Sequence, residues 1–188
     1  MKSQFYTLLL AALLQSTGAW GAERPQPVPL VPQAYLEAAR KAKEEFTRGN
    51  YREAEKTYRG LLTAIPHNLY PYILSNLGVV RFRSGEFKLA VKTFRQAIAI
   101  APNDAFSHCT LGIVYYSQKR YDDAIKSLRR AIELEPGNAT AHDYLGHAYS
   151  EKGMLAEADK EWNITRRLDP SYFERPDEIP ANFRPNES

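Results

Sequence analysis

A chain of 188 residues, of which 44% are hydrophobic, is long enough to bury one continuous core, so we expect a single folded domain. Its 25 lysines and arginines nearly balance 22 aspartates and glutamates, and both signs are interspersed, which argues against a nucleic-acid-binding or polybasic membrane-binding protein. Cys109 is the only cysteine, so an internal disulfide is excluded and a small buried side chain is expected.

The first 21 residues have the layout of a secretory signal peptide. Lys2 precedes an apolar run from Phe5 to Leu14, and small residues follow, with Ala19 and Gly21 suited to cleavage. A membrane-spanning helix would need ~20 apolar residues, which this run does not supply. We therefore predict an exported protein, periplasmic or secreted, without membrane insertion after cleavage.

A proline-rich tether is predicted over residues 22–34. The segment ERPQPVPLVPQ at positions 23–33 contains four prolines, which favour an extended polyproline II spacer over a helix. A ligand for an aromatic groove is the alternative interpretation of this segment.

An internal repeat dominates the rest of the chain. Three kinds of residue recur at a spacing of 34: the Leu-Gly pairs at 77–78, 111–112 and 145–146, then Ala90, Ala124 and Ala158, then Pro102, Pro136 and Pro170. A shift of 36 extends the same columns back to Ala42, Ala54 and Pro66. Two columns of mostly large residues accompany them: Tyr51, Phe87, Tyr121 and Leu155, and Tyr58, Phe94, Leu128 and Trp162.

Each period is predicted to form two helices, because the second half of each carries apolar residues at helical spacing. We expect the turn inside each unit near Gly49, Gly85, the Lys119-Arg120 pair and Gly153, and the turn between units at the proline. The glycine and alanine columns let two helices cross closely, and large apolar residues fill the space between neighbouring hairpins. A single hairpin cannot bury its apolar face, so the units must stack.

This pattern resembles the tetratricopeptide repeat (TPR) family, with units at 35–68, 71–104, 105–138 and 139–172. The first unit is the weakest match, because Lys41 and Glu45 stand where the family favours apolar residues. The resemblance implies an all-α, right-handed superhelical solenoid of four helix-turn-helix units. It also implies a concave surface, lined by the first helix of each unit, that binds an extended peptide or a partner helix.

On that surface the resemblance places a largely apolar and aromatic stripe with a polar end. Its predicted groove residues are Tyr72, Ser75, Asn76, Val79, Phe82, Phe106, Cys109, Ile113, Tyr116, Asp143 and His147. Packing between helices is the alternative for the apolar members, since groove and core faces of a helix differ by only about 100°. The family's carboxylate clamp does not fit, because Phe106 and Thr110 stand where basic or polar groups are needed.

Asp143, His147 and Glu151 recur four residues apart on one helical face. A divalent-metal site or an acid/base site is one interpretation of this spacing, and a solvated helix surface is the other. Motifs of zinc proteases, serine hydrolases, phosphate loops and dinucleotide sites are missing from the sequence. We therefore predict no enzyme activity, no cofactor and no resident metal.

The tail, residues 173–188, cannot form a long capping helix because Pro176, Pro180 and Pro185 interrupt it. Ile164 and Leu168 must then be covered by the tail itself, by a partner or by a second copy, which leaves a homo-oligomer as an alternative. The hypothesis from the sequence is a non-enzymatic adaptor that binds a protein or peptide of the cell envelope, with no nucleic-acid partner.

Overall fold

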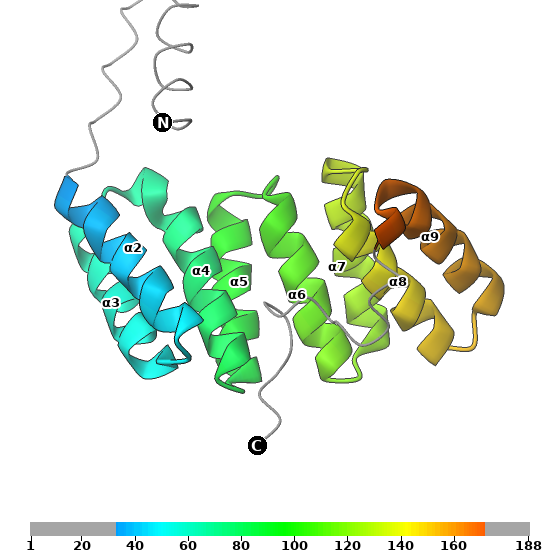
Figure 1. The fold of residues 1–188 in the computed structure, drawn as a ribbon, viewed down its shortest axis with the longest axis horizontal. Helices are drawn as coiled ribbons and strands as arrows, with labels where there is room; N and C mark the ends of the chain where they lie inside the picture. The colour runs from blue at the N-terminus through cyan, green and yellow to red at the C-terminus, as the bar shows by residue number, and fades with distance from the viewer. Residues whose placement is uncertain (1–32, 172–188) are drawn as a thin grey trace, which may run out of the picture. The chain divides into compact units, whose positions relative to one another are not determined.

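The computed structural model describes residues 33–171, and this part of the chain is helical throughout apart from its turns (Figure 1). The elements are α2 Gln33–Thr47, α3 Tyr51–Ala64, the 3-10 turn η1 His67–Leu69, α4 Tyr70–Arg83, α5 Phe87–Ile100, α6 Ala105–Ser117, α7 Tyr121–Leu134, α8 Ala139–Glu151 and α9 Leu155–Leu168. Within residues 33–171 no helix is both long and apolar enough to cross a membrane. The predicted signal peptide (1–21), the tether up to Pro32 and the tail (173–188) lie outside the described residues.

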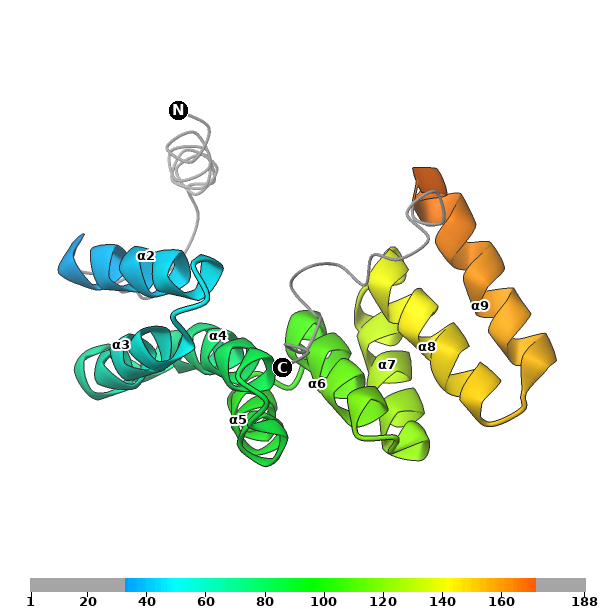
Figure 2. The same ribbon diagram turned by 60° about the horizontal axis from the view of Figure 1, so that its bottom comes forward.

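The helices pack as four consecutive hairpins, α2/α3, α4/α5, α6/α7 and α8/α9, and each hairpin contacts the next (Figures 1 and 2). The first helices also touch across units, α4 against α6 and α6 against α8, whereas the described second helices make no comparable contact with one another. The stack is therefore tighter on its first-helix side, which is the concave side. The predicted all-α solenoid of four helix-turn-helix units is confirmed.

The turns inside the hairpins lie where the sequence predicts them. Gly49, Gly85 and Gly153 adopt φ values of 82°, 81° and 74°, and Lys119 takes the same left-handed conformation with φ 59°. In each unit the backbone N–H of the following residue donates to the carbonyl five residues earlier, which closes the first helix. A left-handed residue is thus required at this position, and only the third unit uses a residue other than glycine.

Small residues on the first helices meet large residues on the second. A Cβ atom added to Gly78 would lie 2.7 Å from the Phe94 ring, and one added to Gly112 would lie 2.5 Å from Leu128 Cγ. At the equivalent position of α8, a Cβ on Gly146 would lie 2.6 Å from the Trp162 indole nitrogen. Each of these glycines thus faces a large residue of its own hairpin, whereas the sequence predicted that large residues fill the space between neighbouring hairpins. This contact sets how closely each hairpin closes.

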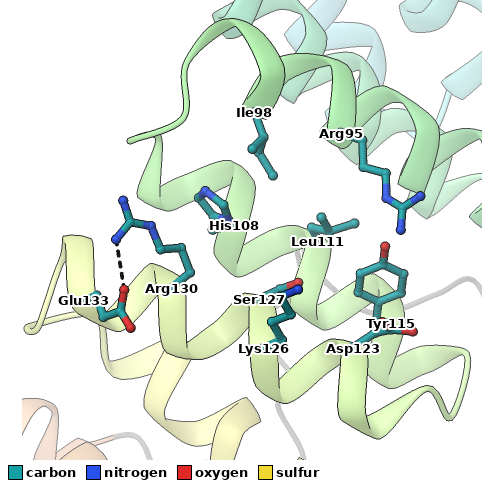
Figure 3. Close-up of a pocket in the computed structure, with 10 residues that line it drawn as sticks. All are labelled: Arg95, Ile98, His108, Leu111, Tyr115, Asp123, Lys126, Ser127, Arg130 and Glu133. Carbon is teal, nitrogen blue, oxygen red and sulfur yellow. Dashed lines mark hydrogen bonds and ion pairs between the residues drawn. The ribbon is translucent and has the colours of Figure 1, made fainter.

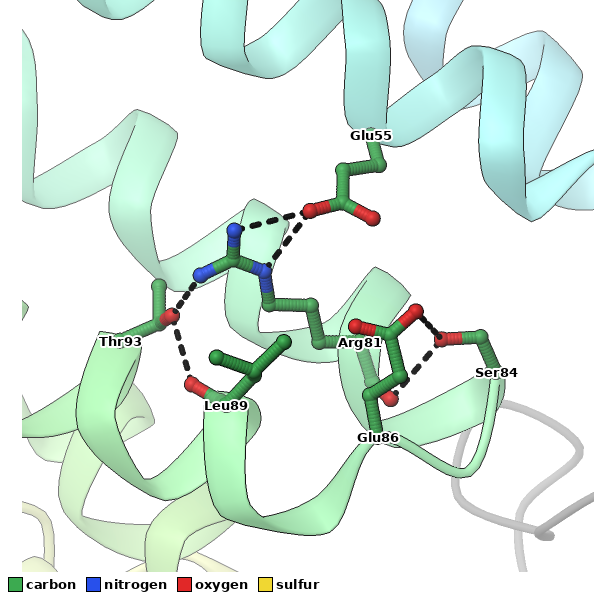
Figure 4. A network of polar contacts seen from close by, with 6 residues as sticks. All are labelled: Glu55, Arg81, Ser84, Glu86, Leu89 and Thr93. Carbon is green, nitrogen blue, oxygen red and sulfur yellow. Dashed lines mark hydrogen bonds and ion pairs between the residues drawn. The ribbon is translucent and has the colours of Figure 1, made fainter.

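The hydrophobic core is divided at the second unit. One cluster joins α2, α3 and part of α4, and the other extends from the end of α4 to α9. Arg81 on α4 bridges the helices at this boundary: its Nε and Nη2 donate to Glu55 Oε1 on α3 at 3.0 and 2.8 Å, and its Nη1 donates to Thr93 Oγ1 on α5 at 2.6 Å (Figure 4). A polar network therefore links the first unit to the rest.

Two boundaries differ from the predicted ones. Helix α2 begins at Gln33, inside the range 22–34 assigned to the tether, because the proline run ends at Pro32 and nothing at Gln33 or Ala34 opposes a helix. Helix α4 begins at Tyr70, one residue before the predicted start of the second unit at 71. The 3-10 turn η1 precedes it, and Pro71 suits the first turn of α4.

Candidate functional site

Exposed apolar side chains recur at one position of the first helices. Leu36 on α2, Tyr72 on α4 and Phe106 on α6 are 53%, 63% and 46% exposed, and they are related by the repeat shifts of 36 and 34. Tyr72 and Phe106 were predicted from the sequence, and Leu36 was missed although the same shift locates it. We call these three residues the apolar column.

Phe106 of this column also lines a pocket of about 250 Å³ that residues of α2, α3, α4 and α6 form. Its lining residues are Lys43, Phe46, Thr47, Tyr58, Asn76, Val79, Val80 and Phe106. Three of them, Asn76, Val79 and Phe106, were predicted; the contribution of α2 was not. The apolar column and this pocket together form what we call the first-helix groove.

Polar groups of the groove are few and fixed. Asn76 Nδ2 donates to the Tyr72 carbonyl at 2.8 Å, which orients the amide along α4. Burial, with a smaller effect of Tyr72, raises the pKa of Tyr58 to about 12, so its hydroxyl stays neutral. Lys43 supplies a positive charge to the pocket wall. The pocket thus suits an apolar side chain with a polar or acidic neighbour.

Four predicted groove residues instead lie in the core. Phe82 and Ile113 have no exposed surface, because a rotation of about one residue turns a groove position into a packed one. Ser75 is buried, with its Oγ 2.7 Å from Ser107 Oγ. Cys109 is also buried, which raises the pKa of its thiol to about 12 and removes it as a nucleophile.

The remaining predicted residues gather at the α8 end of the first-helix side. Tyr116 lies 5.7 Å from Tyr144 and 6.1 Å from His147, and the His147 ring lies 5.4 Å from Trp162, measured between ring centroids. The Nε2 atom of His147 is 3.4 Å from Oδ2 of buried Asp143. That hydrogen bond raises the pKa of His147, while burial opposes the change.

The metal interpretation of Asp143, His147 and Glu151 is not supported by the geometry. Glu151 turns away to accept a hydrogen bond from the Tyr121 hydroxyl at 2.9 Å, although it lies on the same helix. In the range 33–171 no group of three or more histidine, cysteine or acidic side chains is placed to hold a metal ion. Equal spacing on a helix did not bring the three side chains together.

Family comparisons agree with the architecture. A TPR repeat model matches residues 114–153, and a model of the anaphase-promoting complex (cyclosome) subunit 3 matches residues 47–131. A comparison with curated proteins finds no match.

Solved structures of similar fold cover most of the helical stack. MamA matches with 23% identity and a TM-score of 0.66 over 76% of this chain and 82% of that one. YrrB, described as a TPR protein with an unusual peptide-binding site, matches with 20% identity and a TM-score of 0.63 over 74% of this chain and 71% of that one. The second TPR of Spaghetti (RPAP3), bound to an HSP90 peptide, matches with 22% identity and a TM-score of 0.53 over 53% of this chain and 93% of that one.

Proposed function

Because this chain belongs to the tetratricopeptide repeat family, we propose that it is a non-enzymatic protein-interaction scaffold. Its first-helix groove would hold an extended or helical segment of another protein. The observation that carries this proposal is the apolar column, since three large side chains at one repeat position stay exposed and one of them, Phe106, lines a pocket. Exposed apolar groups that line up in this way mark binding surfaces, and aromatic ones are the usual anchors.

The bound segment is expected to insert an apolar side chain rather than a terminal carboxylate. YrrB is described as having a peptide-binding site and the second TPR of RPAP3 as bound to an HSP90 peptide, which supports a peptide partner in general. In this chain Phe106 is apolar and Thr110 is buried, with its hydroxyl donating to the Phe106 carbonyl at 2.9 Å. Neither position can hold a carboxylate, so recognition would depend on apolar contacts made by Tyr72 and Phe106.

The partner is proposed to be a protein of the cell envelope or the secretory route. This part of the proposal comes from residues 1–21, whose charge and hydrophobicity are typical of a cleaved export signal. A homo-oligomer stays a prediction, because the partner segment could belong to a second copy.

Affinity capture from a cell-envelope extract tests the groove. Tyr72→Ser and Phe106→Ser alter exposed side chains, so the fold should persist. Leu89→Ser is the matched control, because Leu89 is also 43% exposed and lies on α5, which contributes no lining residue to the groove. Loss of a hot-spot aromatic costs about 2 kcal/mol, or roughly thirtyfold in affinity. We expect the double groove variant to lose partners that the control retains; equal capture by both would reject the groove.

A further inference from the structure

A second, larger pocket of about 440 Å³ lies between α5, α6 and α7, and Arg95, Lys126 and Arg130 stand at its edge (Figure 3). Its floor is apolar, since Leu111 and Tyr115 are buried and Ile98 is partly buried. We call this site the outer pocket, because second helices form most of its wall. It shares no lining residue with the first-helix groove.

The acidic residues of the outer pocket are already neutralised. Asp123 accepts a hydrogen bond from Arg120 Nε at 2.8 Å, and Glu133 accepts one from Arg130 Nη1 at 2.9 Å. Arg130 also donates to Asn103 at 3.0 Å. No acidic side chain within residues 33–171 is paired with the exposed Arg95 or Lys126. Two cations therefore face solvent above an apolar floor.

Positive charge accumulates around this pocket. Lys126 belongs to a repeat column that places an exposed lysine on the second helix of each unit: Lys56, Lys92, Lys126 and Lys160. Arg95 belongs to a neighbouring arginine column with Arg59 and Arg129. Helix α5 carries Lys88, Lys92 and Arg95 and no acidic residue at all. Helix α5 therefore contributes only positive charge to the wall of the outer pocket.

We propose that the outer pocket binds an acidic segment of a partner polypeptide. One carboxylate would pair with Arg95 and Lys126, and a neighbouring apolar side chain would rest on Ile98 and Leu111. Charge complementarity selects a negatively charged ligand. The apolar floor favours a polypeptide with alternating acidic and apolar residues over an inorganic anion or a lipid headgroup, neither of which would fill it.

A designed peptide provides the probe: a short fluorescent peptide in which glutamates alternate with leucines, beside one in which glutamines replace the glutamates. Binding to the full chain is followed by fluorescence anisotropy, and the site is mapped by amide chemical shifts. Arg95→Gln/Lys126→Gln is the test variant. Lys160→Gln/Arg167→Gln is the matched control, with the same charge change at two exposed positions of α9.

We expect the glutamate peptide to shift resonances of α5 and α7, and the test variant to weaken it about tenfold while the control changes it less than about twofold. Phe106→Ser should leave this binding unchanged, which separates it from the first-helix groove. Equal weakening by both charge variants would show diffuse attraction and overturn the proposal. Equal binding of the glutamine peptide, or no localised shift, would also overturn it, as would binding of anionic lipid vesicles that competes fully with the peptide.

Discussion

The contact between Gly112 and Leu128 can be tested with one added methyl group. In Gly112→Ala, the new Cβ would lie 2.5 Å from Leu128 Cγ, 2.9 Å from its Cδ2 and 3.3 Å from the Ala124 carbonyl oxygen. Leu128 is fully buried and cannot move aside. Overpacking of this kind costs about 3 kcal/mol at the upper end, against a gain of about 1 kcal/mol in helix propensity. The net expectation is a loss of about 2 kcal/mol.

Gly60 is the matched control, because it also lies within a helix but has no atom within 4 Å of a built Cβ. In Gly60→Ala only the higher helix propensity of alanine should act, so the free energy of unfolding should rise by about 1 kcal/mol. Urea unfolding followed by circular dichroism measures both variants.

The cause of the loss is tested by a double change. If the methyl group collides with Leu128, then Gly112→Ala should lower the free energy of unfolding less in a Leu128→Ala background than in the native chain. The reason is that the cavity left by Leu128→Ala can accommodate the added methyl group. A Gly112→Ala protein as stable as the native one would refute the view that glycine is needed for helix approach.

Three further outcomes follow from the turns and polar pairs. Lys119→Gly should raise the free energy of unfolding by about 1 kcal/mol, since Lys119 has φ 59°, and urea unfolding measures the change. Arg81→Leu should lower it by about 2 kcal/mol by leaving Glu55 half-buried and unpaired, and adding Glu55→Ala should restore part of the loss. His142 is held by Glu161 at 2.6 Å, a hydrogen bond that raises the pKa of the imidazole above 6.5. The stabilisation by this pair is fully present below pH 6.5 and is lost as pH rises through the folded-state pKa of His142. Over that pH range the free energy of unfolding of the native protein should fall by about 1 kcal/mol more than that of His142→Gln. Parallel pH profiles of the two proteins would contradict this.

The repeat columns made the hairpins predictable. The spacing of 34 places Gly112 and Gly146 in one column and Leu128 and Trp162 in another, and each column occupies one place in a repeated packing arrangement. That the two columns contact each other within a hairpin is shown by the structure. The turn at Lys119 was also predictable, even without a glycine, since its position in the period matched Gly85.

The groove was less predictable, because first helices are packed on more than one face. Phe82 and Ile113 carry the same kind of side chain as Phe106, yet only Phe106 is exposed. Residue type cannot distinguish them, and a small rotation of a helix decides which one faces solvent. The role of α2 was missed for a different reason: Leu36 and Phe46 come from the weakest repeat.

The outer pocket was not predicted, because the order of charges along the chain differs from their arrangement by position in the repeat. Lys126 follows Asp122 and Asp123 in sequence, so the segment seems balanced. Folding aligns Lys126 with Lys92 and Lys56 instead, while Asp123 accepts a hydrogen bond from Arg120. A positive face therefore arises from an almost neutral sequence.

The same columns distinguish α9 from the second helices that precede it. On second helices, Val91 and Ile125 occupy one column and Ile98 and Ile132 another, and all four pack against the core. The equivalent residues of α9 are Asp159 and Arg166, both exposed. A further first helix packed there would bury two charged groups where the preceding units bury aliphatic ones, at a cost that aliphatic contacts do not carry. Helix α9 therefore offers a less favourable docking face than α5 and α7, and the surfaces we propose for partners are the first-helix groove and the outer pocket.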